Sequence, residues 1–168
     1  MKKLLIVLTS LFFVTAAVAQ NDSLQAPYKR FPSFPPVKLL LPDSVSYFTK
    51  NDLPKKTPVM LMMFNPQCEH CQHETEELTK NIDKFKDILV VMTTSMPFDS
   101  MLRFREKFHL AQYKNIIVSQ DENYFLFSYI TPTNAKCSNV GVTINCFSKA
   151  IVAGPTGKFD SIYNLLIN

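Results

Sequence analysis

One segment limits the possible folds of this chain more than any other. An entirely apolar run, residues 59–64, leads directly into Cys68-Glu69-His70-Cys71. The run predicts a strand that is buried on both faces of a sheet. Apolar residues then recur at helical spacing through residues 68–85, which predicts an amphipathic helix that starts at the cysteines. The two cysteines therefore lie where a buried strand passes into a helix.

The segments around this unit alternate between strand and helix patterns. Strands are predicted at residues 37–41, 45–48, 88–92 and 116–118, helices at 97–108 and 159–167, a short helix or turn at 122–129, and a late hairpin at 140–146 and 150–153. This order predicts an α/β fold with a central mixed sheet that is flanked by helices, parallel in its middle and antiparallel at its end. The first two strands form an N-terminal hairpin extension.

The N-terminus has the features of a secretory signal peptide. Lys2 and Lys3 precede an apolar run, and Ala17-Val18-Ala19 is a small-residue cleavage site, so we expect residues 1–19 to be removed. The apolar run is shorter than the roughly 20 residues that span a bilayer. Residues 20–36 contain four prolines and predict an extended lead-in, and residues 37–168 form the domain. We expect the mature protein in the periplasm or secreted, where paired cysteines can form disulfides.

Composition and charge exclude several classes of protein. The 168 residues suit one globular domain, and four cysteines are too few to be its scaffold. The net charge of +4 includes Lys2 and Lys3, and the mature chain retains 16 basic against 14 acidic residues. That balance lacks the large excess of basic residues that is typical of proteins that bind nucleic acid. We expect a monomer.

The position of the cysteines predicts thiol chemistry. The free backbone N–H groups at a helix start stabilise a thiolate on Cys68, which makes it the attacking sulfur. Cys71, one turn later, faces the core and resolves the mixed disulfide. His70 adds positive charge near the thiolate when it is protonated, and Glu69 opposes it. This pattern predicts a redox-active Cys68–Cys71 disulfide and no other cofactor or metal.

Together with Thr131-Pro132, this strand, Cys-x-x-Cys and helix resemble the thioredoxin fold, and residues 45–64 resemble its TlpA/ResA-type periplasmic branch. The resemblance covers residues 37–132. It implies a thiol-disulfide oxidoreductase that acts on extracytoplasmic proteins and is kept reduced by a membrane-bound electron donor. It also implies that Glu74 assists proton transfer at Cys71, that Pro132 is a cis-proline facing the disulfide, and that Thr131 offers its backbone to a substrate.

The chain departs from this family pattern at several positions. Gln67 replaces an aromatic residue before the first cysteine, and Glu76 stands where the family has proline. Residues 134–139 intervene after Pro132, where the family runs straight into a strand. Pro155 is a rival for the cis-proline, but too few residues follow it for two strands and a helix.

Metal binding is the main alternative function. Cys68, His70, Cys71 and His73 are potential ligands for copper or zinc, so a thioredoxin-like metal carrier remains open. A helix that starts at Cys68 turns the two histidines away from the sulfurs, and the distant His109 is expected to be an ordinary helix-end residue.

Other features have structural explanations. Cys137 and Cys146 either form a second disulfide or are two small residues that never pair. Glu74 is either a catalytic group or a solvated helix residue. The methionines of the apolar run are expected to pack in the core. Basic residues at 103, 105 and 107 belong to a solvated helix face.

Overall fold

The computed structural model describes residues 27–31, 34–130, 149–153 and 159–161. Its centre is a mixed seven-stranded sheet with the strand order β2-β1-β5-β4-β3-β6-β7. Strand β3 (Val59–Met63) pairs in parallel with β4 (Leu89–Thr94), which pairs in parallel with β5 (Ile116–Gln120). All five residues of β3 are buried, as the apolar run predicts.

Antiparallel strands complete both sides of the sheet. β1 (Lys38–Leu40) and β2 (Tyr47–Thr49) form the predicted hairpin and join the sheet through β5. The carboxylate of Asp43 closes their turn, accepting hydrogen bonds from the backbone N–H groups of Val45 and Ser46 at 3.0 and 2.8 Å. On the other side, β6 (Lys149–Ala153) pairs with β3 and then with β7 (Phe159–Ser161).

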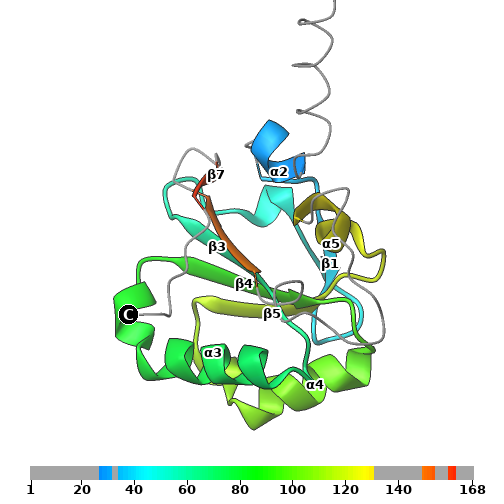
Figure 1. Cartoon of the computed structure of the whole chain (residues 1–168), viewed down its shortest axis with the longest axis vertical. Helices are drawn as coiled ribbons and strands as arrows, with labels where there is room; N and C mark the ends of the chain where they lie inside the picture. The colour runs from blue at the N-terminus through cyan, green and yellow to red at the C-terminus, as the bar shows by residue number, and fades with distance from the viewer. Residues whose placement is uncertain (1–26, 32–33, 131–148, 154–158, 162–168) are drawn as a thin grey trace, which may run out of the picture.

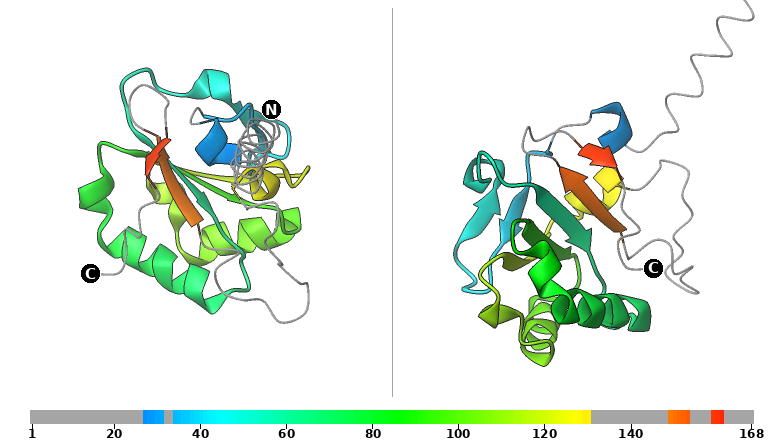
Figure 2. Two further views of the ribbon diagram at one scale, coloured as in Figure 1. Left: turned by 45° about the horizontal axis from the view of Figure 1, so that its top comes forward. Right: turned by 90° about the vertical axis from the view of Figure 1, so that its left-hand side faces the viewer.

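The direction of the crossovers decides which face each helix covers. From β3 to β4 to β5 the chain steps the same way across the sheet, and right-handed crossovers then place both connecting helices on one face. These helices are α3 (Glu69–Lys80) and α4 (Phe98–Lys107). Figures 1 and 2 show them together below the sheet, whereas α2 (Pro27–Arg30) and α5 (Phe125–Ile130) lie on the other side.

Alternate residues of the central strands fill two separate parts of the core. The part under α3 and α4 includes Met60, Met62, Phe64, Cys71, Leu78, Met92, Met101, Phe104 and Phe108. The part under α2 and α5 includes Phe34, Val37, Leu39, Leu61, Met63, Val91, Leu126 and Ile130. Because successive strand residues point to opposite faces, β3 contributes side chains to both.

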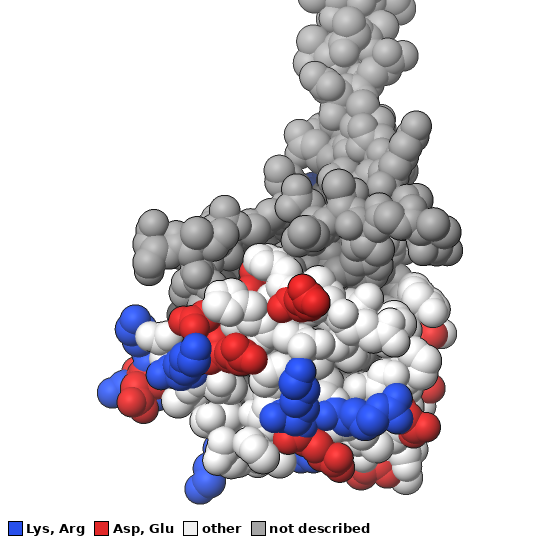
Figure 3. Space-filling view, turned by 60° about the horizontal axis from the view of Figure 1, so that its bottom comes forward, with Lys and Arg blue, Asp and Glu red and all other residues white. Residues whose placement is uncertain are grey.

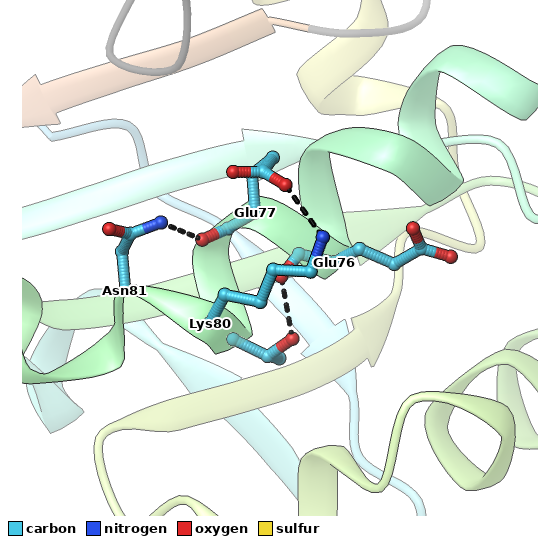
Figure 4. Close-up of polar contacts among 5 residues, drawn as sticks. Glu76, Glu77, Lys80 and Asn81 are labelled. Carbon is cyan, nitrogen blue, oxygen red and sulfur yellow. Dashed lines mark hydrogen bonds and ion pairs between the residues drawn. The ribbon is translucent and has the colours of Figure 1, made fainter.

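Helix α3 ends earlier than the sequence pattern predicts. α3 stops at Lys80, and a separate 3₁₀ turn, η2 (Ile82–Phe85), carries the apolar pattern onward. Figure 4 shows the closing contacts: Asn81 Nδ2 donates to the Glu77 carbonyl at 2.9 Å, and Lys80 Nζ lies 2.8 Å from Glu77 Oε1. Two more 3₁₀ turns are η1 (Lys50–Asp52) and η3 (Leu110–Gln112).

Two further sequence predictions are wrong within the described residues. The extended lead-in contains a helical turn, α2, and Phe34 beyond it is buried, so core packing starts before Val37. The predicted helix at 159–167 begins as strand β7, because these residues pair with β6. The strand predicted at 140–146 lies outside the described residues. Over the ranges that the structure describes, every helix is too short or too polar to cross a bilayer.

Candidate active site

The cysteines lie at the carboxyl end of the parallel strands, where β3 passes into α3. Asn65 shapes the connection: its side-chain oxygen accepts from the Gln67 N–H at 2.9 Å, and its carbonyl accepts from the Cys68 N–H at 3.1 Å. Such Asx turns redirect a chain within a few residues. Cys68 is the N-cap of α3 and its carbonyl accepts from the Gln72 N–H at 3.0 Å. The turn therefore presents Cys68 at the positive end of a twelve-residue helix.

The two sulfur atoms lie in different surroundings. Cys68 is half-buried, whereas Cys71 has an exposed fraction of 0% and belongs to the core under α3 and α4. Both are in the reduced form. The backbone N–H of Asn65 points to Cys71 Sγ at 3.4 Å, so the turn contacts both cysteines. Cys68 is therefore the more accessible of the two sulfur atoms.

Burial controls the ionisation of the inner thiol. It raises the pKa of Cys71 to about 12, because a thiolate loses its hydration there. The Asn65 N–H lowers this pKa, while the neighbouring Cys68 and the negative charge of Glu74 raise it further. Cys71 is therefore a neutral thiol at neutral pH.

His70 and Glu74 contact each other on the first turns of α3. His70 Nε2 lies 2.9 Å from Glu74 Oε1, and the two side chains are 37% and 19% exposed. Their spacing of four residues places them on one side of the helix. The sequence predicts that a protonated His70 adds positive charge near the Cys68 thiolate, and in the structure its imidazole contacts the Glu74 carboxylate. Glu74 thus raises the pKa of Cys71 through its negative charge and also contacts His70 near the surface.

Gln72 connects three parts of the site. The sequence did not predict these contacts. Gln72 Nε2 donates to the Pro66 carbonyl at 2.9 Å, and its Oε1 accepts from Lys107 Nζ at 2.7 Å. These bonds tie the turn before Cys68 to α3 and to the end of α4. The Asn65-Pro66 pair was a visible turn signal, but nothing local in the sequence pairs residue 72 with residue 107.

Aromatic rings support the same junction from below. The ring centroids of Phe64 and Phe104 are 4.4 Å apart, and those of Phe104 and Phe108 are 4.6 Å apart. Buried aromatic pairs of this kind contribute about 1 kcal/mol beyond the area they bury. They fix α4 against the end of β3, immediately before the turn that carries the cysteines.

The described residues offer little for a metal ion. No three His, Cys, Asp or Glu side chains among them converge in an arrangement that could hold one. His73 is exposed, and two residues along a helix it points nearly opposite to the buried Cys71. His109 is exposed beyond the end of α4. His70 has its own partner in Glu74.

Several predicted site residues lie outside the described residues. These are Thr131, Pro132, Cys137 and Cys146, together with the rival Pro155. Of the two departures from the family pattern, Gln67 is exposed in the turn before Cys68 and Glu76 is exposed on α3. Glu69 is exposed in the first helical turn.

The architecture is shared with solved structures of thiol-disulfide proteins. One is a secreted disulfide oxidoreductase of Mycobacterium tuberculosis homologous to E. coli DsbE, with a TM-score of 0.56, 16% identity, and coverage of 77% of this chain and 83% of that one. Another is MTB DsbF, with a TM-score of 0.58, 15% identity, and coverage of 81% and 91%. A thioredoxin-like protein of Aeropyrum pernix has a TM-score of 0.55, 10% identity, and coverage of 90% and 91%.

The fold is therefore thioredoxin-like, as the sequence resemblance implied. No family model matches the sequence, and no curated protein matches it either. At these identities the likeness defines the fold, and the chemistry must be argued from the residues at the β3–α3 junction.

Proposed function

We propose that this protein is a thiol-disulfide oxidoreductase that exchanges disulfides with proteins outside the cytoplasm. The observation that carries the proposal is the contrast between a reachable Cys68 at a helix N-terminus and a fully buried Cys71 one turn later. A pair with one accessible and one protected sulfur suits sequential attack. The solved relatives named as disulfide oxidoreductases support the same chemistry.

The reaction proceeds in two exchanges. The Cys68 thiolate attacks one sulfur of a substrate disulfide, forming a mixed disulfide and releasing the other substrate sulfur as a thiolate that takes up a proton. Cys71 then gives up its proton, attacks the Cys68 sulfur and expels the second substrate thiolate. The substrate gains two electrons, and the protein is left with a Cys68–Cys71 disulfide. Reversal of these steps oxidises a substrate dithiol.

Glu74 is placed to help the second exchange. Cys71 must lose a proton although burial raises its pKa to about 12. The carboxylate of Glu74, three residues further along the helix, is close enough for its charge to act on that thiol. We assign it the role of proton acceptor for Cys71, with His70 holding its carboxylate at the other side. Reduction of the resulting disulfide in an oxidising compartment requires a dithiol donor, for which a membrane-bound protein is the expected source.

Trapping experiments test this function. Cys71→Ser should accumulate mixed disulfides on Cys68, and Cys68→Ser should abolish the dithiothreitol-dependent reduction of insulin that the wild-type chain accelerates. Mass spectrometry of the trapped species identifies the protein substrates. Absence of insulin reduction by the wild-type chain, combined with protection of both thiols by added copper or zinc, would instead establish a metal carrier.

A further inference from the structure

An open hollow of about 180 Å³ lies beside the turn that carries the cysteines. It is lined by Pro66, Gln67, Ser100, Arg103, Phe104 and Lys107. The first two residues belong to the turn before Cys68, and the others belong to α4. The hollow therefore lies between the start of the cysteine helix and the neighbouring helix, on the same face of the sheet.

The charged side chains known to line this hollow are positive. Among the described residues, Arg103 and Lys107 line it and no carboxylate does. Among the described residues, the contacts between basic and acidic side chains are His70 with Glu74 and Lys80 with Glu77. Neither Arg103 nor Lys107 is therefore paired with a described carboxylate. Basic and acidic side chains are intermingled over the wider surface that Figure 3 brings forward, which makes the positive charge at the hollow a local feature.

Both cations have hydrogen-bonding capacity left. The Arg103 guanidinium donates to Ser100 Oγ at 3.2 Å, and the Lys107 ammonium donates to Gln72 Oε1 at 2.7 Å. A guanidinium carries five N–H donors and an ammonium carries three. Each contact also holds its side chain in place, so less conformational entropy is lost when an anion binds. Phe104 adds an apolar part to the lining.

We propose that this hollow binds an acidic side chain of the protein substrate, close in sequence to the cysteine that Cys68 attacks. The inference rests on the proposed function and names its substrate class: disulfides flanked by Asp or Glu. Gln67 lines the hollow and directly precedes Cys68. Because extended chain advances about 3.3 Å per residue, an acidic residue two or three positions from the attacked cysteine reaches about 7–10 Å from it. The carboxylate of this acidic residue then contacts Arg103 and Lys107, while the sulfur of the attacked substrate cysteine faces Cys68.

The test uses two cystine peptides that differ only in Glu or Gln at the second and third positions after the cysteine. Their rates of reduction by the reduced wild-type chain are each divided by their rates with dithiothreitol, which removes intrinsic reactivity differences. At low salt the wild-type chain should prefer the acidic peptide about fivefold, a typical effect of two exposed ion pairs. The preference should shrink in 0.5 M salt, because exposed charges are screened.

Variants separate the hollow from the general charge of the protein. Arg103→Gln and Lys107→Gln should each lower the preference from about fivefold to about twofold, and Arg103→Glu, which sets a negative charge beside the remaining Lys107, should abolish it. Arg105→Gln is the matched control, because Arg105 lies on the same helix but does not line the hollow; it should retain the preference. Equal normalised rates for both peptides with the wild-type chain overturn the docking proposal and leave the oxidoreductase intact. Failure to reduce either peptide rejects both.

Discussion

The two thiols at the start of α3 differ in their access to water. Cys71 is fully buried beneath the helix, whereas Cys68 is half-buried at the helix start. A thiolate is the reactive form of cysteine, and burial disfavours that charge. One sulfur is therefore available to partners outside the protein, and the other reacts with its neighbour.

Alkylation of the reduced protein should distinguish the two thiols. At pH 8 a pKa of about 12 leaves Cys71 roughly one part in ten thousand ionised, and the protein covers its sulfur. Iodoacetamide should therefore modify Cys68 more than about a hundredfold faster than Cys71 in the native chain. Peptide mass spectrometry at successive times measures both rates.

Unfolding supplies the control for this comparison. In urea the two cysteines should react at similar rates, because neither is buried. Equal rates in the native chain would contradict the described environment of Cys71.

Single residues were predictable where one local pattern decides their place. Cys71 falls on the apolar stripe of its helix, so its burial follows from spacing. The bonds of Asn65 and Gln72 depend on side-chain directions at the turn, and the Gln72–Lys107 bond joins residues 35 positions apart. The contact between His70 and Glu74 is likewise known only from the structure.

At the level of elements, α3 is fixed at both ends by side chains. Asn81 and Lys80 close its C-terminal end through Glu77. At the other end Gln72 reaches back to the Pro66 carbonyl, and Lys107 brings α4 to the same amide. The turn before Cys68 is thus supported by two helices and not by its own backbone alone.

Removing this bridge should loosen the turn. Gln72→Ala deletes the donor to Pro66 and the acceptor for Lys107, and we expect a loss of about 1–2 kcal/mol in the free energy of unfolding. Gln72→Glu keeps an acceptor for Lys107 but lacks the donor, so it should recover part of the loss. Urea denaturation of the reduced proteins measures both effects.

Gln112→Ala provides a matched comparison for these variants. Gln112 is exposed in η3, and its replacement should change the free energy of unfolding by less than about 0.5 kcal/mol. If Gln72→Ala is as stable as this control, the bridge does not support the turn.

Sequence patterns located most elements but not all of their ends. The apolar runs of β3 and β4 and the stripe of α4 are long enough to identify strand and helix. The end of α3 was missed because η2 continues the same apolar pattern into Phe85. The strand β7 was missed because a three-residue edge strand is defined by pairing with β6, which no local periodicity reports.

Across the whole molecule, the sheet separates the site from the rest of the core. α3 and α4 cover the face that holds Cys71, and α5 and the segment around Phe34 cover the other. The order of the parallel strands and their right-handed crossovers explain this division. The overall class was predictable from the alternation of strands and helices, whereas the burial of Phe34 depends on a long-range contact that the proline-rich sequence conceals.

The buried thiol should make global stability depend on pH. Below about pH 9 Cys71 is neutral in both the folded and the unfolded chain, so its contribution is fully present. Between about pH 9 and 12 only the unfolded thiol ionises, unfolding releases a proton, and stability falls as pH rises. The free energy of unfolding of the reduced chain should fall by an amount on the order of 2 kcal/mol from pH 9 to pH 11 through this group.

Cys71→Ala isolates that contribution. The variant should lose stability less steeply over this pH range, although it starts from a lower value because of the cavity it creates. Burial also raises the pKa of Tyr129, and this effect is common to both proteins, so it cancels in the difference. Parallel stability curves for the two proteins would contradict the raised pKa of Cys71.

The packing under α3 and α4 also shields a group of sulfur atoms from oxidants in the solvent. Met60, Met62, Met92 and Met101 share this part of the core with Cys71, and all five are buried. Thioethers and thiols are the side chains that peroxides attack most readily, and a sulfoxide in this core would disrupt its packing. Within this part of the core Cys68 is the partly exposed sulfur, and it is also the one that exchange with a second thiol can restore.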